Sequence, residues 1–152
     1  MTNPQHPMGT LATLGYTEAG AREQIDAFLA RPRSYLVDIR LVPYSRFRPQ
    51  WNRPALKARY GRQYVHLRGL GNLHYQDPRK PIHLLGPEPH IEHLAKQLSL
   101  GTSYLLLCAC KNYERCHRKV VYEQILLQLG AQPEEQEAVV PLGAVYAPSL
   151  WG

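Results

Sequence analysis

Segments with the residue pattern of buried strands alternate along this chain with segments that have the pattern of amphipathic helices. The strand-like segments are residues 11–16, 34–42, 63–70 and 103–108, and the helix-like segments are residues 18–30, 54–60, 91–100 and 116–129. Such alternation is typical of βαβ units that build a mostly parallel sheet, and right-handed crossovers place helices on both of its faces. We therefore expect a three-layer α/β fold with a mostly parallel sheet of about four or five strands.

The length of the chain, 152 residues, corresponds to one domain. We expect this single α/β domain at residues 10–142, with a last short strand at residues 139–140. A flexible tail at residues 1–9 should precede it, and a C-terminal tail at residues 143–152 should follow. Residues 71–89 contain four prolines and should form a long irregular loop, which in a compact domain is usually functional or mobile.

Several features argue against a membrane or secreted protein. The apolar runs are far shorter than the ~20 residues of a membrane span. The first ten residues have neither the basic nor the apolar region of a secretory signal. The three cysteines lie close together between residues 108 and 116, which is not the pattern of a disulfide framework. We expect a cytoplasmic protein with reduced thiols and no membrane partner.

Positive charge is concentrated in one part of the chain. The formal net charge is +6, but residues 40–80 hold eight arginines and two lysines against the single acidic residue Asp77, which makes 10 − 1 = +9. Aromatic residues lie among these cations, as on surfaces that bind nucleic acids. The nucleic-acid-binding candidates are Arg46, Arg48, Arg53 and Trp51. The alternative is a solvated basic surface whose aromatic side chains pack inward.

The densest group of chemically active residues follows the fourth expected strand. Ligands of parallel α/β sheets bind at the carboxyl ends of the strands, where Asp38, Arg40 and Cys108 should meet. Cys116 and His117 open the following helix, whose N-terminus favours anions and thiolates. The segment therefore predicts an anion site with a reactive thiol. In it, Cys108 or Cys116 would be the nucleophile, and His117 or Asp38 would transfer protons.

Other interpretations of the cysteines remain open. Cys108, Cys110, Cys116 and His117 could together ligate a metal ion, but their spacing is not a common zinc pattern, and adjacent Cys and His residues rarely bind one ion. We therefore predict no metal and no cofactor. Cys108 and Cys116 are eight residues apart across a strand–loop–helix turn, so a reversible disulfide between them is a further possibility. Cysteines buried as small hydrophobic residues are the structural alternative.

Five sequence elements together resemble one known family. They are Thr13–Thr17 (TLGYT), Val37–Arg40 (VDIR) followed by Pro43 and Ser45, Asn52–Leu56, Tyr64–Leu67 with Leu70-Gly71, and Leu107-Cys108-Ala109 followed by Cys116-His117-Arg118. This ordered set, over about residues 10–130, resembles the domain-of-unknown-function family 488. The resemblance implies a compact α/β domain with a Cys/Arg-lined edge, and it implies no reaction. Cys110 replaces a usual Glu, and Asn72 replaces a common second Gly.

Three functions fit these residues. The first is an enzyme that uses a reactive thiol on a phosphate-bearing or nucleic-acid substrate, with Arg40, Ser45, Arg115 and Arg118 binding the anion. The second is a non-catalytic module that binds DNA or RNA and has structural cysteines. The third is a Cys-ligated metal or redox site.

Overall fold

The computed structural model describes residues 7–110, 112–130 and 145–146. Strands and helices alternate as expected. The order is β1 (Leu11–Gly15), α1 (Ala21–Leu29), β2 (Ser34–Asp38), α2 (Arg53–Tyr60), β3 (Tyr64–His66), α3 (Glu88–Ser99), β4 (Ser103–Cys108), α4 (His117–Gln128) and β5 (Val145–Tyr146). Short 3₁₀ turns occur at Pro49–Trp51, Gly61–Gln63, Arg68–Leu70 and Tyr113–Arg115.

The strands form one sheet in the order β3-β2-β4-β1-β5. β4 lies between β2 and β1 and is parallel to both, and β3 is parallel to β2. Only β5 runs antiparallel, along β1. The prediction of an α/β fold with a mostly parallel sheet is therefore confirmed. β5 lies within the segment expected to be a tail, and the strand expected at residues 139–140 falls outside the described residues.

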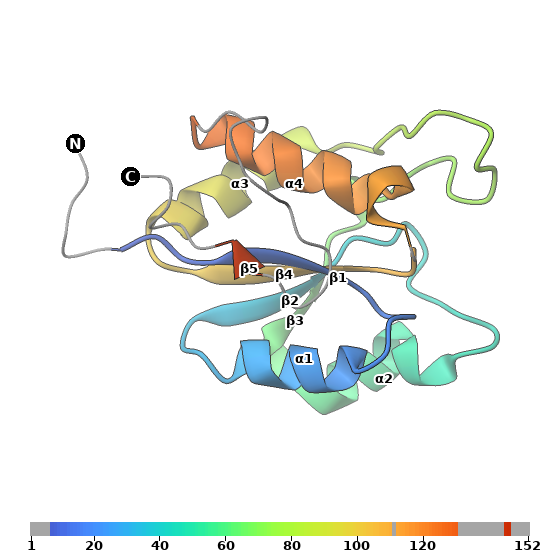
Figure 1. Ribbon diagram of the computed structural model, residues 1–152, viewed down its shortest axis with the longest axis horizontal. Coiled ribbons are helices and arrows are strands. Elements are labelled where there is room, and N and C mark those ends of the chain that lie inside the picture. The colour runs from blue at the N-terminus through green and yellow to red at the C-terminus, as the bar shows by residue number, and fades with distance from the viewer. Residues whose placement is uncertain (1–6, 111, 131–144, 147–152) are drawn as a thin grey trace.

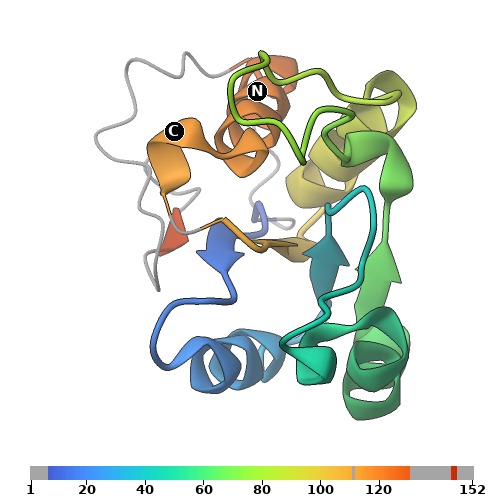
Figure 2. The ribbon, with the colours of Figure 1, turned by 90° about the vertical axis from the view of Figure 1, so that its right-hand side faces the viewer.

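Helices cover both faces of the sheet (Figure 1, Figure 2). α1 and α2 lie on one face and α3 and α4 on the other. Successive side chains of a strand point to opposite faces. In β4, Leu105 and Leu107 accordingly pack in the cluster of α1 and α2, whereas Leu106 and Cys108 pack in the cluster of α3 and α4. This alternation places Cys108 on the side of the sheet from which α4 starts.

Two strands are shorter than expected, and one helix is longer. The second and third strands end at Asp38 and His66, because the chain beyond Asp38 turns to bring Arg40 back to its carboxylate. The last link between these strands is the bond from the Leu67 N–H to the Asp38 carbonyl. α3 begins three residues before the expected start, with Pro89 in its first turn. Proline fits there because a first-turn N–H has no partner within the helix.

The connections open a crevice at the carboxyl ends of β2 and β4. After β2 the chain passes to the face of α2, and after β4 it passes to the opposite face, where α4 lies (Figure 1). In open α/β sheets such a divergence between neighbouring strands creates the usual ligand site. None of the described helices has the length and apolar composition needed to cross a membrane.

Candidate functional site

A cleft of about 720 Å³ occupies this crevice. Residues 40–42 and Tyr44, which follow β2, form one wall, and residues from the 72–82 segment form the other. The floor consists of residues 108–110 together with Arg115 and His117. The second wall belongs to the segment that the prolines predicted to be an irregular loop. Backbone hydrogen bonds order it, from Leu73 N–H to the His83 carbonyl at 2.8 Å and from Leu85 N–H to the Gly71 carbonyl at 3.0 Å.

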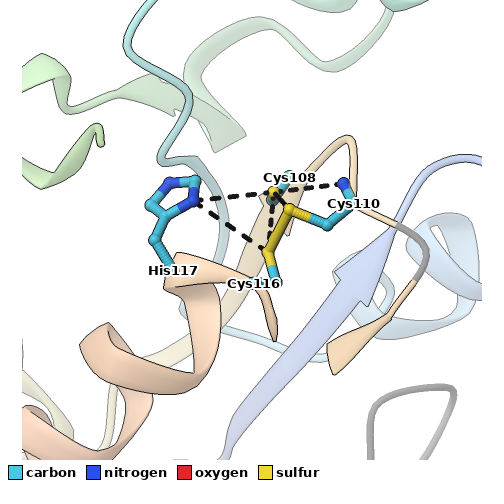
Figure 3. A group of neighbouring side chains, drawn as sticks. All are labelled: Cys108, Cys110, Cys116 and His117. Atoms are coloured by element: carbon cyan, nitrogen blue, oxygen red, sulfur yellow. Dashed lines mark hydrogen bonds between the residues drawn. A yellow bond between two sulfur atoms is a disulfide. The ribbon is translucent and has the colours of Figure 1, made fainter. Parts of the chain in front are cut away.

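Three sulfur atoms and one imidazole converge on one point (Figure 3), and three of the four residues, Cys108, Cys110 and His117, line the cleft. Cys110 and Cys116 are joined by a disulfide, and Cys108 is a free thiol. The Cys108 Sγ lies 2.9 Å from the Cys110 Sγ and 3.0 Å from the Cys116 Sγ. The ligand atoms of the Cys₃His cluster (Cys108, Cys110, Cys116 and His117) all lie within 4.8 Å of one another. The pairing differs from the Cys108–Cys116 disulfide and from the fully reduced thiols that the sequence suggested.

The ring of His117 has a defined tautomer. Its Nε2 lies 2.7 Å from the carbonyl oxygen of Ile39, which can only accept a hydrogen bond, so Nε2 carries the proton. The Nδ1 lone pair therefore points at the sulfurs, 3.9 Å from the Cys108 Sγ and 4.0 Å from the Cys116 Sγ (Figure 3). Burial lowers the pKa of His117, which keeps the ring neutral.

Backbone amides surround the sulfurs. The Cys110 N–H donates to the Cys108 Sγ at 3.3 Å, and the Arg118 N–H donates to the Cys116 Sγ at 3.5 Å. Cys116 is the N-cap residue of α4, so its sulfur accepts from the first turn as a serine oxygen would. N–H···S bonds and a helix N-terminus both stabilise a sulfur that carries negative charge.

Arg118 is fully buried beside this cluster. Its Nη1 donates to the Thr13 Oγ1 at 3.0 Å, and its guanidinium carbon lies 5.2 Å from the centre of the Tyr113 ring. Its Nε has no hydrogen-bond partner, and none of the ion pairs among the described residues includes Arg118. Burial lowers its pKa, and Cys108 is the largest influence that raises it. The charge of Glu18 also raises the pKa of Arg118, but no carboxylate is hydrogen-bonded to the guanidinium among the described residues, so this position favours anionic sulfur nearby.

Cys108 is protonated at neutral pH in this oxidised state. Burial raises the pKa of its thiol to about 11, although the amide of Cys110 and the charge of Arg118 oppose the shift. The thiolate is the nucleophilic form of cysteine. The environment of Cys108 therefore does not generate a thiolate at neutral pH while Cys110 and Cys116 are paired.

Asp38 and Arg40 form a buried pair at the end of β2. The Asp38 Oδ1 accepts from the Arg40 Nε at 2.8 Å, and the Oδ2 accepts from the Arg40 Nη2 and the Tyr64 hydroxyl, both at 2.6 Å. Burial lowers the pKa of Arg40, but the hydrogen bond and charge of Asp38 raise it overall. Both carboxylate oxygens are occupied, so the geometry gives Asp38 the role of holding Arg40, whose Nη2 also donates to the Trp51 carbonyl.

The structure separates the other predicted anion-binding residues. Arg40 and Arg115 line the cleft, together with Lys80. Arg118 lies buried behind the cysteines. Ser45 is not among the cleft-lining residues, and its hydroxyl accepts from the Arg48 N–H at 3.1 Å. Of the predicted set, only Arg40 and Arg115 are thus placed to meet a ligand in the cleft.

The predicted nucleic-acid residues fall into two groups. Arg46, Arg48 and Arg53 are exposed. Trp51 is only 5 % exposed, and its ring stacks on Tyr16 with centroids 5.0 Å apart. It therefore belongs to the core and offers no free face to a base.

Two contributors to the site were missing from the predicted residues. Cys110 was noted only as a departure from the family pattern and as one member of an unfavoured ligand set. The Ile39 carbonyl, which orients His117, is a backbone group and has no sequence signal. The Cys-x-Cys spacing is the signal that could have indicated Cys110, because residues two apart at a strand end can both turn toward the following helix.

These features define an α/β domain whose cysteine- and arginine-containing cleft lies at the carboxyl edge of a parallel sheet. The chain belongs to the family described as Domain of unknown function DUF488, whose model matches residues 22–125. The VDIR, YVHL and LLCA…CHR elements lie within the matched range, so the resemblance expected from the sequence is confirmed. Comparison with curated proteins gives no significant match, and neither does comparison with solved structures.

Proposed function

We propose that the protein, with its cysteines reduced, binds one zinc ion through the Cys₃His cluster. The observation that carries this proposal is the convergence of three Sγ atoms and the His117 Nδ1 within 4.8 Å. Thiolates and imidazole are the ligands that zinc prefers, and Cys₃His is a common structural set. The sequence spacing favoured no metal, but spacing is a weak guide where a strand end, a loop and a helix start fold onto one point.

The orientation of His117 supports the proposal. A metal-bound histidine usually donates its second ring N–H to a carbonyl or carboxylate, which fixes the tautomer and directs the other nitrogen at the metal. The bond from the His117 Nε2 to the Ile39 carbonyl at 2.7 Å has this form. Cys108 and Cys116 lie 3.9 and 4.0 Å from Nδ1, close to the roughly 3.5 Å that separates a sulfur and a nitrogen on one tetrahedral zinc.

Charge balance gives independent support. Three thiolates, one neutral imidazole and one divalent cation carry a net charge of −1. Arg118 supplies one buried positive charge that forms no ion pair among the described residues, although the more distant charge of Glu18 also raises its pKa. A loaded cluster beside Arg118 would therefore be neutral overall, which is the favourable state for a buried group of charges.

Loading requires the Cys110–Cys116 pair to be reduced. A dithiol reductant supplies two electrons, is itself oxidised to a disulfide, and leaves two free thiols. Binding then displaces three protons, one from each cysteine. The sulfurs must move apart from 2.9–3.0 Å to the roughly 3.7 Å of a tetrahedral zinc–thiolate site, which breaking the disulfide permits. With four protein ligands the ion would organise the floor of the cleft and would hold no reactive water.

The test is metal analysis of protein purified under a reductant without added chelator. We expect one zinc per chain, and Co²⁺ substitution should give the spectrum of a tetrahedral thiolate site. Cys110→Ser and His117→Ala should each lower zinc affinity at least tenfold. His74→Ala, which removes a histidine from the cleft wall, is the matched control and should not. Wild-type protein that holds far less than one equivalent of any metal and gives no cobalt spectrum would contradict the proposal.

A further inference from the structure

An exposed loop beside the cleft combines aromatic rings with arginines. This β2–α2 loop (residues 39–52) carries Phe47, whose side chain is 86 % exposed, and Tyr44, which is 64 % exposed. Arg46 and Arg48 flank Phe47, and Arg53 follows at the start of α2. Two aromatic rings of this loop are therefore exposed to water.

The charge of the loop identifies the chemistry of that partner. There is no acidic residue between Asp38 and Asp77 in the sequence. None of the ion pairs among the described residues includes Arg46, Arg48 or Arg53. The guanidinium carbon of Arg46 lies over the ring of Phe47, 5.7 Å from the ring centre. Unpaired arginines beside an exposed ring are suited to a polyanion that also presents flat apolar faces.

Contacts with the core and hydrogen bonds within the loop fix the conformation of the β2–α2 loop. Trp51 anchors it in the core by stacking on Tyr16, and the Trp51 carbonyl accepts from the Arg40 Nη2 at 2.7 Å. Asn52 accepts the Ser45 N–H, and the Ser45 hydroxyl accepts the Arg48 N–H. A partner would therefore meet a loop that is already ordered, so binding costs less conformational entropy.

The cleft continues this surface. Tyr44 belongs to the β2–α2 loop and also lines the cleft. Tyr75, which is half-exposed, lines the cleft from the opposite wall. Lys80 and Arg115 add cations at the same cleft, and Asp77, which also lines it, is paired with Arg79. The cleft therefore offers an aromatic ring on each wall to one base and a nearby cation to its phosphate.

We propose that the β2–α2 loop and the adjoining cleft bind single-stranded nucleic acid. Phe47 and Tyr44 stack on unpaired bases, and Arg46, Arg48 and Arg53 contact phosphates. A single strand is favoured over a duplex because a duplex hides the faces of its bases, which are the partners that exposed rings stack on. The inference goes beyond the proposed zinc site, since no cysteine of that site lies in the loop.

The test is fluorescence anisotropy with labelled oligo-dT and oligo-U of about 12 nucleotides. We expect both strands to bind, and the affinity should fall steeply with salt. Comparison of the affinities for oligo-dT and oligo-U shows whether DNA or RNA is preferred. Phe47→Ala should weaken binding roughly 5- to 150-fold, the usual effect of losing one stacked base, and Phe47→Trp should retain it. Arg46→Ala should reduce the slope of log K against log salt by roughly 0.7.

Matched controls come from the opposite helical layer. Leu127→Ala removes an exposed apolar side chain of α4, and Lys96→Ala removes an exposed cation of α3. Neither should change binding. All these positions are exposed, so the variants should fold as wild type, which circular dichroism checks. Zinc-loaded and chelator-treated protein should both bind, so failure of the zinc proposal would leave this outcome unchanged.

Four outcomes overturn the proposal. The first is an absence of binding to either strand at low salt. The second is an equal loss of affinity in Phe47→Ala and Leu127→Ala. The third is equal binding of a duplex and of its separated strands. The fourth is binding to vesicles of anionic phospholipid that depends on Phe47, without binding to nucleic acid, which would assign the loop to a lipid surface.

Discussion

The backbones of Gly15 and Cys110 are in close contact. A Cβ placed on Gly15, the last residue of β1, would overlap the carbonyl oxygen of Cys110 and lie 3.3 Å from the Arg118 Nη2. The turn that carries Cys110 therefore lies directly on the end of β1. The glycine at this position allows the cysteine to reach the other two sulfurs.

Gly15→Ala should consequently disturb the cluster. Because the obstruction is backbone rather than a flexible side chain, the turn or β1 must shift, at a cost of about 1–3 kcal/mol in the free energy of unfolding. The amount of zinc that the purified protein retains should fall together with its stability. Gly86→Ala is the control, since a Cβ there meets nothing within 4 Å and the change should stay within about 0.5 kcal/mol. Urea unfolding and metal analysis of both variants would decide, and equal behaviour of the two would contradict the close contact.

Asp38→Asn should destabilise the fold strongly. The substitution leaves Arg40, which is 6 % exposed, without its counter-charge, and breaking a buried pair in this way costs about 3–5 kcal/mol. The exposed pair of Asp26 and Arg59 provides the comparison, because Asp26→Asn should hardly change the unfolding midpoint. A mild effect of Asp38→Asn in denaturant unfolding would show that the pair is not needed to hold Arg40.

The substitution Arg118→Met tests whether the Arg118 side chain acts through its charge or through its packing. A methionine removes a buried cation but fills similar space, so the chelator-treated reduced protein should keep or gain stability. The zinc-loaded cluster should lose its compensating charge, and its affinity should fall roughly 10- to 100-fold, as when other groups that support metal ligands are lost. Thermal unfolding with and without zinc measures both effects. A loss of stability that is the same with and without zinc would assign Arg118 a packing role only.

Oxidation should release the metal. Hydrogen peroxide takes two electrons from the thiolates of Cys110 and Cys116, forms their disulfide and is reduced to water. Only Cys108 and His117 then remain as ligands, too few for tight binding. A chromogenic chelator should detect about one equivalent of zinc on peroxide addition, and a dithiol with fresh zinc should restore the loaded state. Zinc that stays bound after the disulfide is detected by mass spectrometry would refute this competition.

Hydrophobic patterning predicted most of the fold correctly. The first, second and fourth strands and all four helices could be recognised because each buries a regular apolar pattern. The second strand was extended beyond its end at Asp38, and the order of the strands in the sheet was not predicted. The third strand was overextended to residue 70, because local alternation cannot show that its partner β2 ends at Asp38. β5 consists of two residues in a segment that resembles a tail, and it pairs with β1, which is more than one hundred residues away in the chain.

The site was predicted in part. The patterns identified Cys108, Cys116 and His117, because they occur where a strand ends and a helix begins. The patterns did not indicate that Cys110 would pair with Cys116, since this depends on how the intervening turn folds. The sequence left open whether Trp51 faces the solvent or packs inward, because aromatic residues between arginines have the same pattern in both cases, and the structure shows it buried.

The whole ligand set lies between Cys108 and His117, so an ion there would close a loop of only ten residues. A short closed loop removes little entropy from the unfolded chain, so the ion adds little global stability by cross-linking. Its presence would reach neighbouring segments through the bond from His117 to Ile39, just beyond β2, and through the contact of Cys110 with the end of β1. Hydrogen exchange should therefore slow in the turn between β4 and α4 on loading, with β3, which the ligand set does not contact, unaffected. In a compartment poor in zinc, the domain would keep its architecture and lose only the rigidity of its cleft floor.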